Sequence, residues 1–128
     1  MPDPITFEYA VLRLVPRVER EEFLNVGVIV FCKRGDFLRA RIDVQPERLH
    51  AFAPYADEMM IRNQLNAFTN ICEGTPESGY FANLSKSERF NWLAAPSSTI
   101  IQTSKVHCGI CNRPLPEILD ELFSFFVK

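Results

Sequence analysis

The chain has 128 residues, of which 47% are hydrophobic and 23% charged, and its formal net charge is -2. This size and composition suit a folded domain that buries its own core, so we expect a single globular domain over residues 1–128 rather than a disordered chain. The small negative charge argues against general binding to nucleic-acid phosphates, and no stretch approaches the roughly 18 apolar residues that a membrane-spanning helix needs.

The N-terminal third of the chain predicts three strands. Residues 5–15 alternate apolar and polar side chains with a period of two, and Arg13 is a charged exception near the end. A charged connector over residues 17–22 leads to residues 26–32, which are apolar on both faces and therefore predict a strand inside the sheet. Residues 37–44 alternate again, which predicts a strand nearer the edge with its odd-numbered face in water.

The remaining residues predict helices and one further strand. Proline favours the first turn of a helix, and apolar side chains three and four positions apart form its buried stripe. Ser85 and Glu88 have the spacing of a capping box, which begins a helix. The expected helices cover residues 46–52, 54–72, 85–95 and 115–126, and the expected strand covers residues 99–107. This order predicts an α+β fold, a mostly antiparallel sheet of about four strands with helices packed on it.

The connector before the buried strand holds the first candidate site. If the first two strands form a hairpin, Arg13 at the end of one strand and Glu22 before the other can form an ion pair. Asn25 can hydrogen-bond the connector backbone, as asparagine often does in loops. Gly27 within a strand indicates a bulge or a close neighbour. These groups either hold the connector in place or bind a ligand, and polar networks at strand ends commonly have the structural role.

The cysteines bear on location and on metal binding. Four cysteines are too few and too scattered for the disulfide framework of a secreted protein, and the N-terminus lacks a signal-peptide pattern, so we expect a cytoplasmic protein. Cys108 and Cys111 form a CxxC pair beside His107, and thiolates at this spacing can share a zinc ion. A structural zinc site needs four ligands, and the missing ones would have to come from distant residues. The sequence therefore predicts no metal and no cofactor.

A basic strand face is the second candidate site. Lys33, Arg34, Arg39 and Arg41 lie within nine positions of one another and can together attract RNA, phosphate or an acidic protein surface. Charges on an edge strand also keep that strand from pairing with other molecules. The net negative charge of the chain favours this second interpretation, so we expect that nucleic acid is not the partner.

No catalytic constellation is visible in the sequence. There is no glycine-rich phosphate loop, no HExxH or GxSxG motif and no Ser/His/Asp order. His107 is one of only two histidines, so acid–base chemistry near the CxxC pair would depend on it. The absence of such a constellation argues against an enzyme.

Two separated segments together resemble one family. Residues 9–13, Tyr-Ala-Val-Leu-Arg, followed by residues 22–28, Glu-Phe-Leu-Asn-Val-Gly-Val, resemble the opening of a family of small bacterial proteins catalogued only as a domain of unknown function. Residues 98–109 are similar to that family's Ser-Thr-x-x-Gln-x-x-x-Val-His-x-Gly segment. The family pattern falls on Arg13, Glu22, Asn25, Gly27, Gln102, His107 and Gly109, whereas Cys108 and Cys111 lie outside it.

The resemblance implies a function through genomic neighbours. Genes of this family often lie beside genes for kinases similar to the HipA toxin kinase, which implies an interaction module that accompanies such a kinase in a toxin–antitoxin-like system. Phe125, off the apolar stripe of the last predicted helix, and the tail over residues 123–126, Phe-Ser-Phe-Phe, are candidates for part of the interface. One alternative is a small-ligand-binding protein or enzyme with a polar pocket, which requires Asn25 and His107 to meet in the fold. Another is nucleic-acid binding through the basic strand face.

Overall fold

An antiparallel sheet of five strands organises the chain, of which the computed structural model describes residues 3–96 and 99–128. Three strands that follow one another in sequence are also neighbours in the sheet: β1 (Ile5–Leu14), β2 (Leu24–Cys32) and β3 (Phe37–Ile42). β4 (Ile101–Thr103) and β5 (His107–Cys111) both pair with the other side of β1. β2 is therefore an interior strand, as predicted, and its residues 26–32 are all buried.

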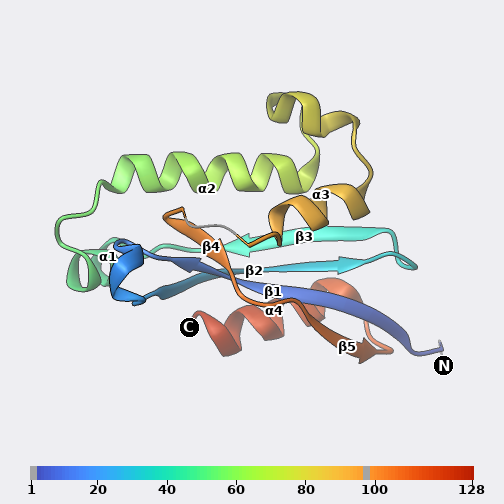
Figure 1. Cartoon of the computed structure of the whole chain (residues 1–128). Coiled ribbons are helices and arrows are strands. Elements are labelled where there is room, and N and C mark those ends of the chain that lie inside the picture. Colours follow the sequence, from blue (N-terminus) through green and yellow to red (C-terminus); the bar gives the residue numbers. More distant parts are fainter. Residues whose placement is uncertain (1–2, 97–98) are drawn as a thin grey trace.

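Helices cover both faces of this sheet (Figure 1). They are α1 (Pro46–Phe52), α2 (Glu58–Glu73), α3 (Lys86–Leu93) and α4 (Leu115–Phe126), with short 3₁₀ helices η1 (Val18–Arg20) and η2 (Pro76–Asn83) in the connections. The first three α-helices pack on one face, and α4 packs alone on the other. The predicted α+β fold is confirmed, with five strands where about four were expected. Within the described ranges, no helix combines the length and the apolar content needed to cross a membrane.

The pleat of β2 divides the core into two halves. Ile29 and Phe31 join the half beneath α2 and α3, whereas Val28 and Val30 join the half against α4. Phe90 of α3 stacks on Phe31 with ring centroids 5.1 Å apart. α2 buries the apolar stripe that its helical spacing predicts, namely Ile61, Leu65, Phe68 and Cys72. Because both faces of β2 are covered, this strand positions the groups at its N-terminal end firmly.

α4 buries a stripe that differs from the predicted one at its C-terminal end. Phe123, which the helical spacing left out, is 1% exposed, while Leu122 and Phe126 are only partly buried. Phe125 is 79% exposed, as its off-stripe position predicts. The helix is therefore rotated so that Phe123 points into the core and Phe125 points into solvent.

The strand predicted over residues 99–107 is in fact two strands joined at Ser104, which is 6% exposed. The backbone N–H of Ser104 donates to Val11 O at 2.8 Å, and the Ser104 hydroxyl oxygen accepts from Val11 N–H at 2.9 Å. The hydroxyl thus takes the place of a backbone carbonyl in the ladder. Thr103 is opposite Leu12, but His107 is opposite Tyr9, so the chain gains one residue relative to β1 here. Because of this extra residue, odd-numbered residues of β5 point to the opposite face of the sheet from odd-numbered residues of β4. His107 therefore lies on the face that α4 covers.

We expect Ser104→Ala to lower the free energy of unfolding by about 2 kcal/mol, because Val11 N–H would be left buried without an acceptor. Urea unfolding followed by circular dichroism measures this change. Ser124 is exposed on α4 and provides the control, since Ser124→Ala should change stability by no more than about 0.5 kcal/mol. Equally small effects of the two substitutions would show that the Ser104 hydroxyl is dispensable.

Candidate functional site

A bulge in β2 decides which face of the sheet Asn25 occupies. Leu12 of β1 pairs with Gly27, and the next residue, Arg13, pairs with Asn25, so the register passes over Val26. Two residues of β2 thus oppose one residue of β1, which is the pattern of a β-bulge. Without the extra residue, Val26 would share the face of Arg13 and Asn25 would lie on the opposite face.

Gly27 is the residue that this local geometry requires. A Cβ at Gly27 would lie 2.8 Å from Arg41 O and 2.9 Å from Ile42 Cγ1 on β3. Both features that a glycine in this strand predicts, a bulge and a close neighbour, are therefore confirmed. The bulge and the tight β2–β3 contact together fix the position of the residues just before Gly27, among which is Asn25.

Residues from the two motif segments meet in one row across three strands. Arg13 on β1 is opposite Asn25 on β2 and also opposite Gln102 on β4. Side chains directly opposite one another in antiparallel strands point to the same face, with Cβ atoms roughly 5 Å apart. We call Asn25, Arg13 and Gln102 the polar row. It lies on the face of the sheet that α4 covers.

Arg13, at the centre of the polar row, has no hydrogen bond or ion pair to any residue that the structure describes. Its guanidinium carbon lies 4.2 Å from the centroid of the Phe23 ring, and its Nε is buried without a partner. The expected ion pair with Glu22 is wrong, because Glu22 pairs with Arg20 instead. Stacking holds the guanidinium in place and leaves its N–H groups available, an arrangement suited to a carboxylate or a phosphate.

The polar row adjoins the C-terminal end of α4. Asn25 Nδ2 donates to Phe126 O at 3.2 Å, and Arg48 of α1 donates to Val127 O at 2.6 Å. The last carbonyls of a helix have no intrahelical donor, so these two side chains satisfy them. Asn25 thus binds α4 rather than the connector backbone, contrary to expectation. Its Oδ1 is buried without a partner.

His107 shares the face of the polar row but lies farther along β1. Its ring stacks on the ring of Tyr9, with centroids 5.2 Å apart, and the Tyr9 ring is 6.1 Å from that of Phe126. Tyr9 is four residues from Arg13, roughly 13 Å along an extended strand. His107 and Asn25 are therefore connected through Phe126, which contacts Tyr9 with its ring and Asn25 with its carbonyl.

Gly109 has a packing role on β5. A Cβ at this position would lie 2.4 Å from Cζ of Phe7, which is 7% exposed. Because Gly109 has no side chain, the Phe7 ring can lie over β5 and pack in the half of the core that α4 covers. This motif residue therefore supports the aromatic packing beside His107.

The cysteine pair has strand geometry. Cys108 is exposed and Cys111 is buried, because residues three apart on a strand point to opposite faces. In residues 3–96 and 99–128, no three His, Cys, Asp or Glu side chains are grouped as a metal site would require. Burial raises the pKa of Cys72 to about 12. Among the four thiols, Cys108 is the one that reagents in solution can reach.

The basic strand face is divided by α4. Arg41 pairs with Asp120 of α4 at 2.7 Å, whereas Lys33 and Arg34 lie in the exposed turn between β2 and β3. Arg39 is exposed farther along β3. The expectation that the odd-numbered face of β3 lies wholly in water is therefore wrong at Arg41, where a helix partly covers it. This ion pair removes one of the four cations from the proposed basic surface.

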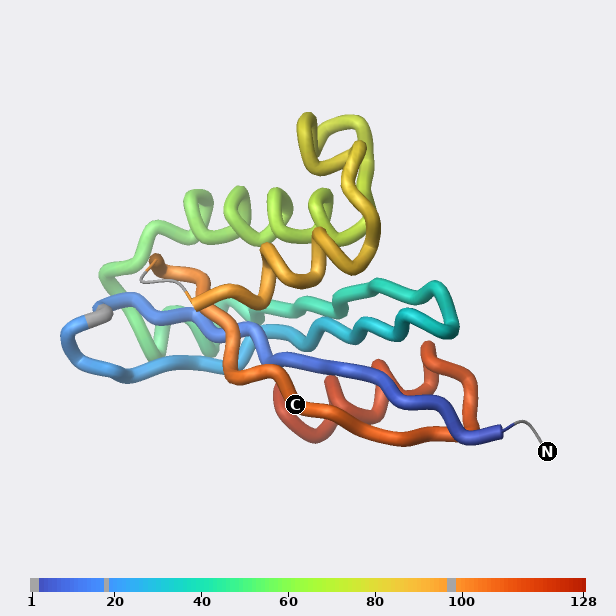
Figure 2. Tube along the Cα trace, turned by 45° about the vertical axis from the view of Figure 1, so that its right-hand side comes forward, coloured from blue at the N-terminus to red at the C-terminus, as the bar shows by residue number. Residues whose placement is uncertain are grey.

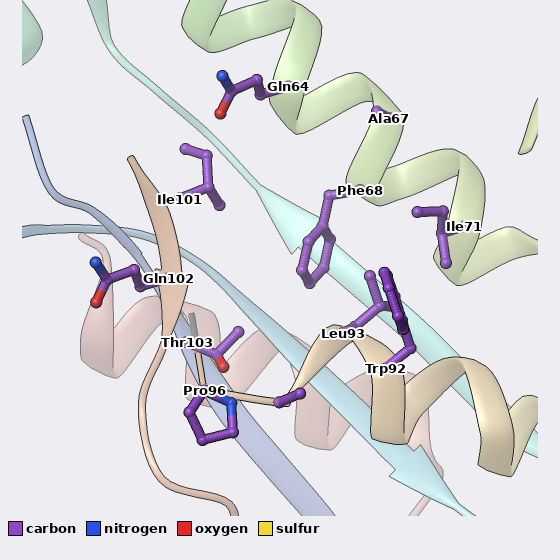
Figure 3. Close-up of a pocket in the computed structure, with 11 residues that line it drawn as sticks. Gln64, Ala67, Phe68, Ile71, Trp92, Leu93, Pro96, Ile101, Gln102 and Thr103 are labelled. Carbon is purple, nitrogen blue, oxygen red and sulfur yellow. The ribbon is translucent and has the colours of Figure 1, made fainter. Parts of the chain in front are cut away.

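An apolar groove of about 510 Å³ lies on the opposite face of the sheet, between α2, α3 and β4 (Figure 3). The residues that line it include two amides but none that is charged, among those that the structure describes: Gln64, Ala67, Phe68, Ile71, Trp92, Leu93, Ala95, Pro96, Ile101, Gln102 and Thr103. Trp92 is 60% exposed at its rim. In Figure 3 the side chain of Gln102 points to the other side of β4 from that of Thr103. Gln102 therefore belongs to both features: it lies at the edge of the groove, and its side chain extends toward the face of the polar row.

Two residues of the site were not singled out by the sequence. Phe23 stacks on Arg13, and its position between Glu22 and Asn25 as a large apolar side chain in a polar connector was the available signal. Phe126 contributes its backbone carbonyl to Asn25, and no sequence pattern reveals an acceptor that every residue type carries.

A family model described as "Protein of unknown function (DUF3037)" matches residues 9–127 of the chain. No curated protein and no solved structure matches it.

Proposed function

Because the chain belongs to the DUF3037 family of proteins of unknown function, we propose a function that combines the family resemblance with the polar row. The protein is an accessory module that binds a HipA-like kinase, and the polar row with Phe23 and Phe125 forms the binding surface. The observation that carries this proposal is the meeting of both motif segments around Arg13, a stacked arginine without a hydrogen-bond partner among the described residues.

The state of Arg13 favours a charged group on the partner. Its guanidinium is partly removed from water, yet no described acceptor compensates its N–H groups. A carboxylate of the kinase can accept two parallel hydrogen bonds from it, and hydrogen bonds to charged groups contribute about 1.5–3 kcal/mol each. Stacking on Phe23 holds the guanidinium before binding, which reduces the entropy lost on association.

Two exposed aromatic side chains flank the polar row. Phe23 is 45% exposed beneath Arg13, and Phe125 is 79% exposed beside Phe126, whose carbonyl binds Asn25. The rings of Phe125 and Phe126 meet edge to face with centroids 4.9 Å apart. Arginine and aromatic residues are enriched at protein interfaces, where they carry much of the binding energy. This combination supports a protein partner over a small polar ligand.

Arg13→Gln is expected to weaken binding of the proposed HipA-like kinase partner by at least about tenfold, which corresponds to about 1.4 kcal/mol. Isothermal titration with the purified kinase measures the affinity. Arg34→Gln, a substitution of an exposed arginine in the β2–β3 turn, should leave the affinity unchanged.

Phe125→Ser tests the same surface without touching the core, since Phe125 is 79% exposed. It should also weaken binding while leaving the unfolding midpoint unchanged. If wild-type protein does not bind the kinase, or if both variants bind as well as wild type, the proposal is wrong.

A second candidate function is the binding of a small apolar ligand in the groove. Its volume of about 510 Å³ lies within the usual range of ligand pockets, and its lining is uncharged. Trp92 is the only tryptophan of the chain, so its fluorescence reports on the groove alone. A screen of neutral apolar compounds that leaves this emission unchanged throughout would argue against this function.

A further inference from the structure

β5 forms an open edge of the sheet. It pairs with β1 on one side, and no described strand pairs with it on the other (Figure 2). Natural edge strands are usually protected by charges, prolines, bulges or short length. The opposite edge strand, β3, carries Arg39 and Arg41. β5 spans five residues and contains no proline, lysine, arginine or carboxylate. This edge therefore lacks the usual protection.

The register shows which backbone groups of β5 point outward. Odd-numbered residues of β1 direct their backbone groups toward β4 and β5, as the bond from Ser104 N–H to Val11 O shows. Gly109 is opposite an odd-numbered residue of β1 and therefore bonds to β1. Cys108 and Ile110 are opposite even-numbered residues, so their N–H and C=O groups point away from β1.

The side chains at these two positions are also exposed. Ile110 is 73% exposed, and Cys108 is exposed beside it on the same face of the strand. They lie on the side of the sheet that carries α2 and α3, but those helices do not bury them. An apolar side chain and four outward backbone groups thus occur together on one strand that has no lysine, arginine or carboxylate.

We propose that β5 pairs with β5 of a second copy of this chain, antiparallel about a two-fold axis at Gly109. In this register Cys108 of each copy is opposite Ile110 of the other, and each such pair exchanges two backbone hydrogen bonds. Gly109 faces its counterpart at the axis, where the lack of a side chain avoids crowding. The two sheets become one continuous sheet, and Ile110 of each copy packs against Cys108 of the other.

A second copy suits this edge for two reasons. An antiparallel strand pair is self-complementary about a two-fold axis, the commonest symmetry of soluble homo-oligomers. The charges adjoining β5 do not oppose pairing strongly, because Arg113 is already bound by Glu121 through contacts of 2.5 and 2.7 Å. Lys105 is left as the exposed cation at the other end. A single strand pair buries little area, so the dimer forms at high concentration.

The pairing would also complete a cavity. Cys108 lines a space of about 690 Å³ together with Thr6, Glu8, Lys33 and Arg34. In the proposed register, Ile110 of the second copy is opposite Cys108. The Ile110 side chain therefore lies at the open side of this space. The second copy thus contributes a wall that one chain lacks.

Sedimentation velocity of the full chain over a range of concentrations tests the pairing. Wild type should shift from monomer to dimer, and Ile110→Lys should raise the dissociation constant at least about tenfold, because it places a solvated cation in the strand pair. Met59→Lys introduces the same charge at a residue of α2 that is 74% exposed, close to the 73% of Ile110, and should leave dimerisation unchanged. Wild type that stays monomeric throughout, or equal effects of the two variants, overturns the proposal.

Cross-linking tests the register. Ile110→Cys places a thiol directly opposite Cys108 of the second copy, within the Cα separation that disulfides accept. Mild oxidation should convert this variant into a covalent dimer that reductant separates. The accompanying Met59→Cys variant should form no such dimer beyond the wild-type level. Failure of Ile110→Cys to cross-link under conditions where wild type is dimeric overturns the two-fold register. Cross-linking of the introduced thiol to a different protein, in place of a second copy of this chain, overturns the choice of partner.

Discussion

Phe123→Ala is expected to reduce the free energy of unfolding by about 3–5 kcal/mol, the usual cost of truncating a buried phenylalanine. Phe123 is 1% exposed in the core between α4 and the sheet, and the guanidinium of Arg41 lies 4.3 Å from its ring centroid. The substitution leaves a cavity and removes this stacking. Urea unfolding followed by circular dichroism measures the loss.

Phe125→Ala is the matched control on the same helix. Phe125 is 79% exposed, so its truncation should change stability by no more than about 0.5 kcal/mol. If the two substitutions destabilised the protein equally, α4 would not be oriented with Phe123 toward the core. Because Asn25 bonds the end of α4, loosening this helix also disturbs the polar row.

Gly27→Val is expected to cost about 3 kcal/mol or more, because the added atoms collide with backbone rather than with a movable side chain. A Cβ would lie 2.8 Å from Arg41 O, so β2 and β3 would have to separate. The same unfolding experiment measures the cost. Gly79→Ala is the comparison: its φ is +64° and its ψ is −120°, and no atom lies within 4 Å of the added Cβ, so only backbone strain of about 1–3 kcal/mol is expected.

A loss for Gly27→Val no greater than that for Gly79→Ala would mean that the β2–β3 contact can relax. The bulge would then not depend on glycine. Weaker kinase binding by such a destabilised variant would not bear on the interface, whereas Phe125 is 79% exposed and its substitution leaves the core intact.

Hydrophobic periodicity predicts the elements of this fold because it reports burial directly. The interior position of β2 and the buried stripe of α2 follow from it, and the capping box at Ser85 and Glu88 is confirmed by reciprocal hydrogen bonds of 3.1 Å. The stripe of α4 is predicted less well, because residues 122–126 are apolar at every position except Ser124 and spacing cannot choose between Leu122 and Phe123.

Strand faces near the site could not be predicted in the same way. A period of two assigns faces correctly only while the register is unbroken. One extra residue at Val26 in β2 places Asn25 beside Arg13, and one extra residue after Ser104 places His107 on that same face. Both irregularities depend on contacts between distant parts of the chain. The sequence identifies the polar residues, but it does not identify the row that they form.

The pairing of β1 with β4 and β5 has a consequence for how the chain is made. Ile5 is opposite Cys111, so β1 leaves the ribosome about a hundred residues before its second neighbour in the sheet is made. Until α4 follows, one apolar face of the β1–β2–β3 meander is bare. Such long-range pairing slows folding and leaves apolar, aggregation-prone surface exposed during synthesis. Nascent chains of this protein are therefore expected to depend on chaperones during translation, and a partial chain that ends before α4 should aggregate.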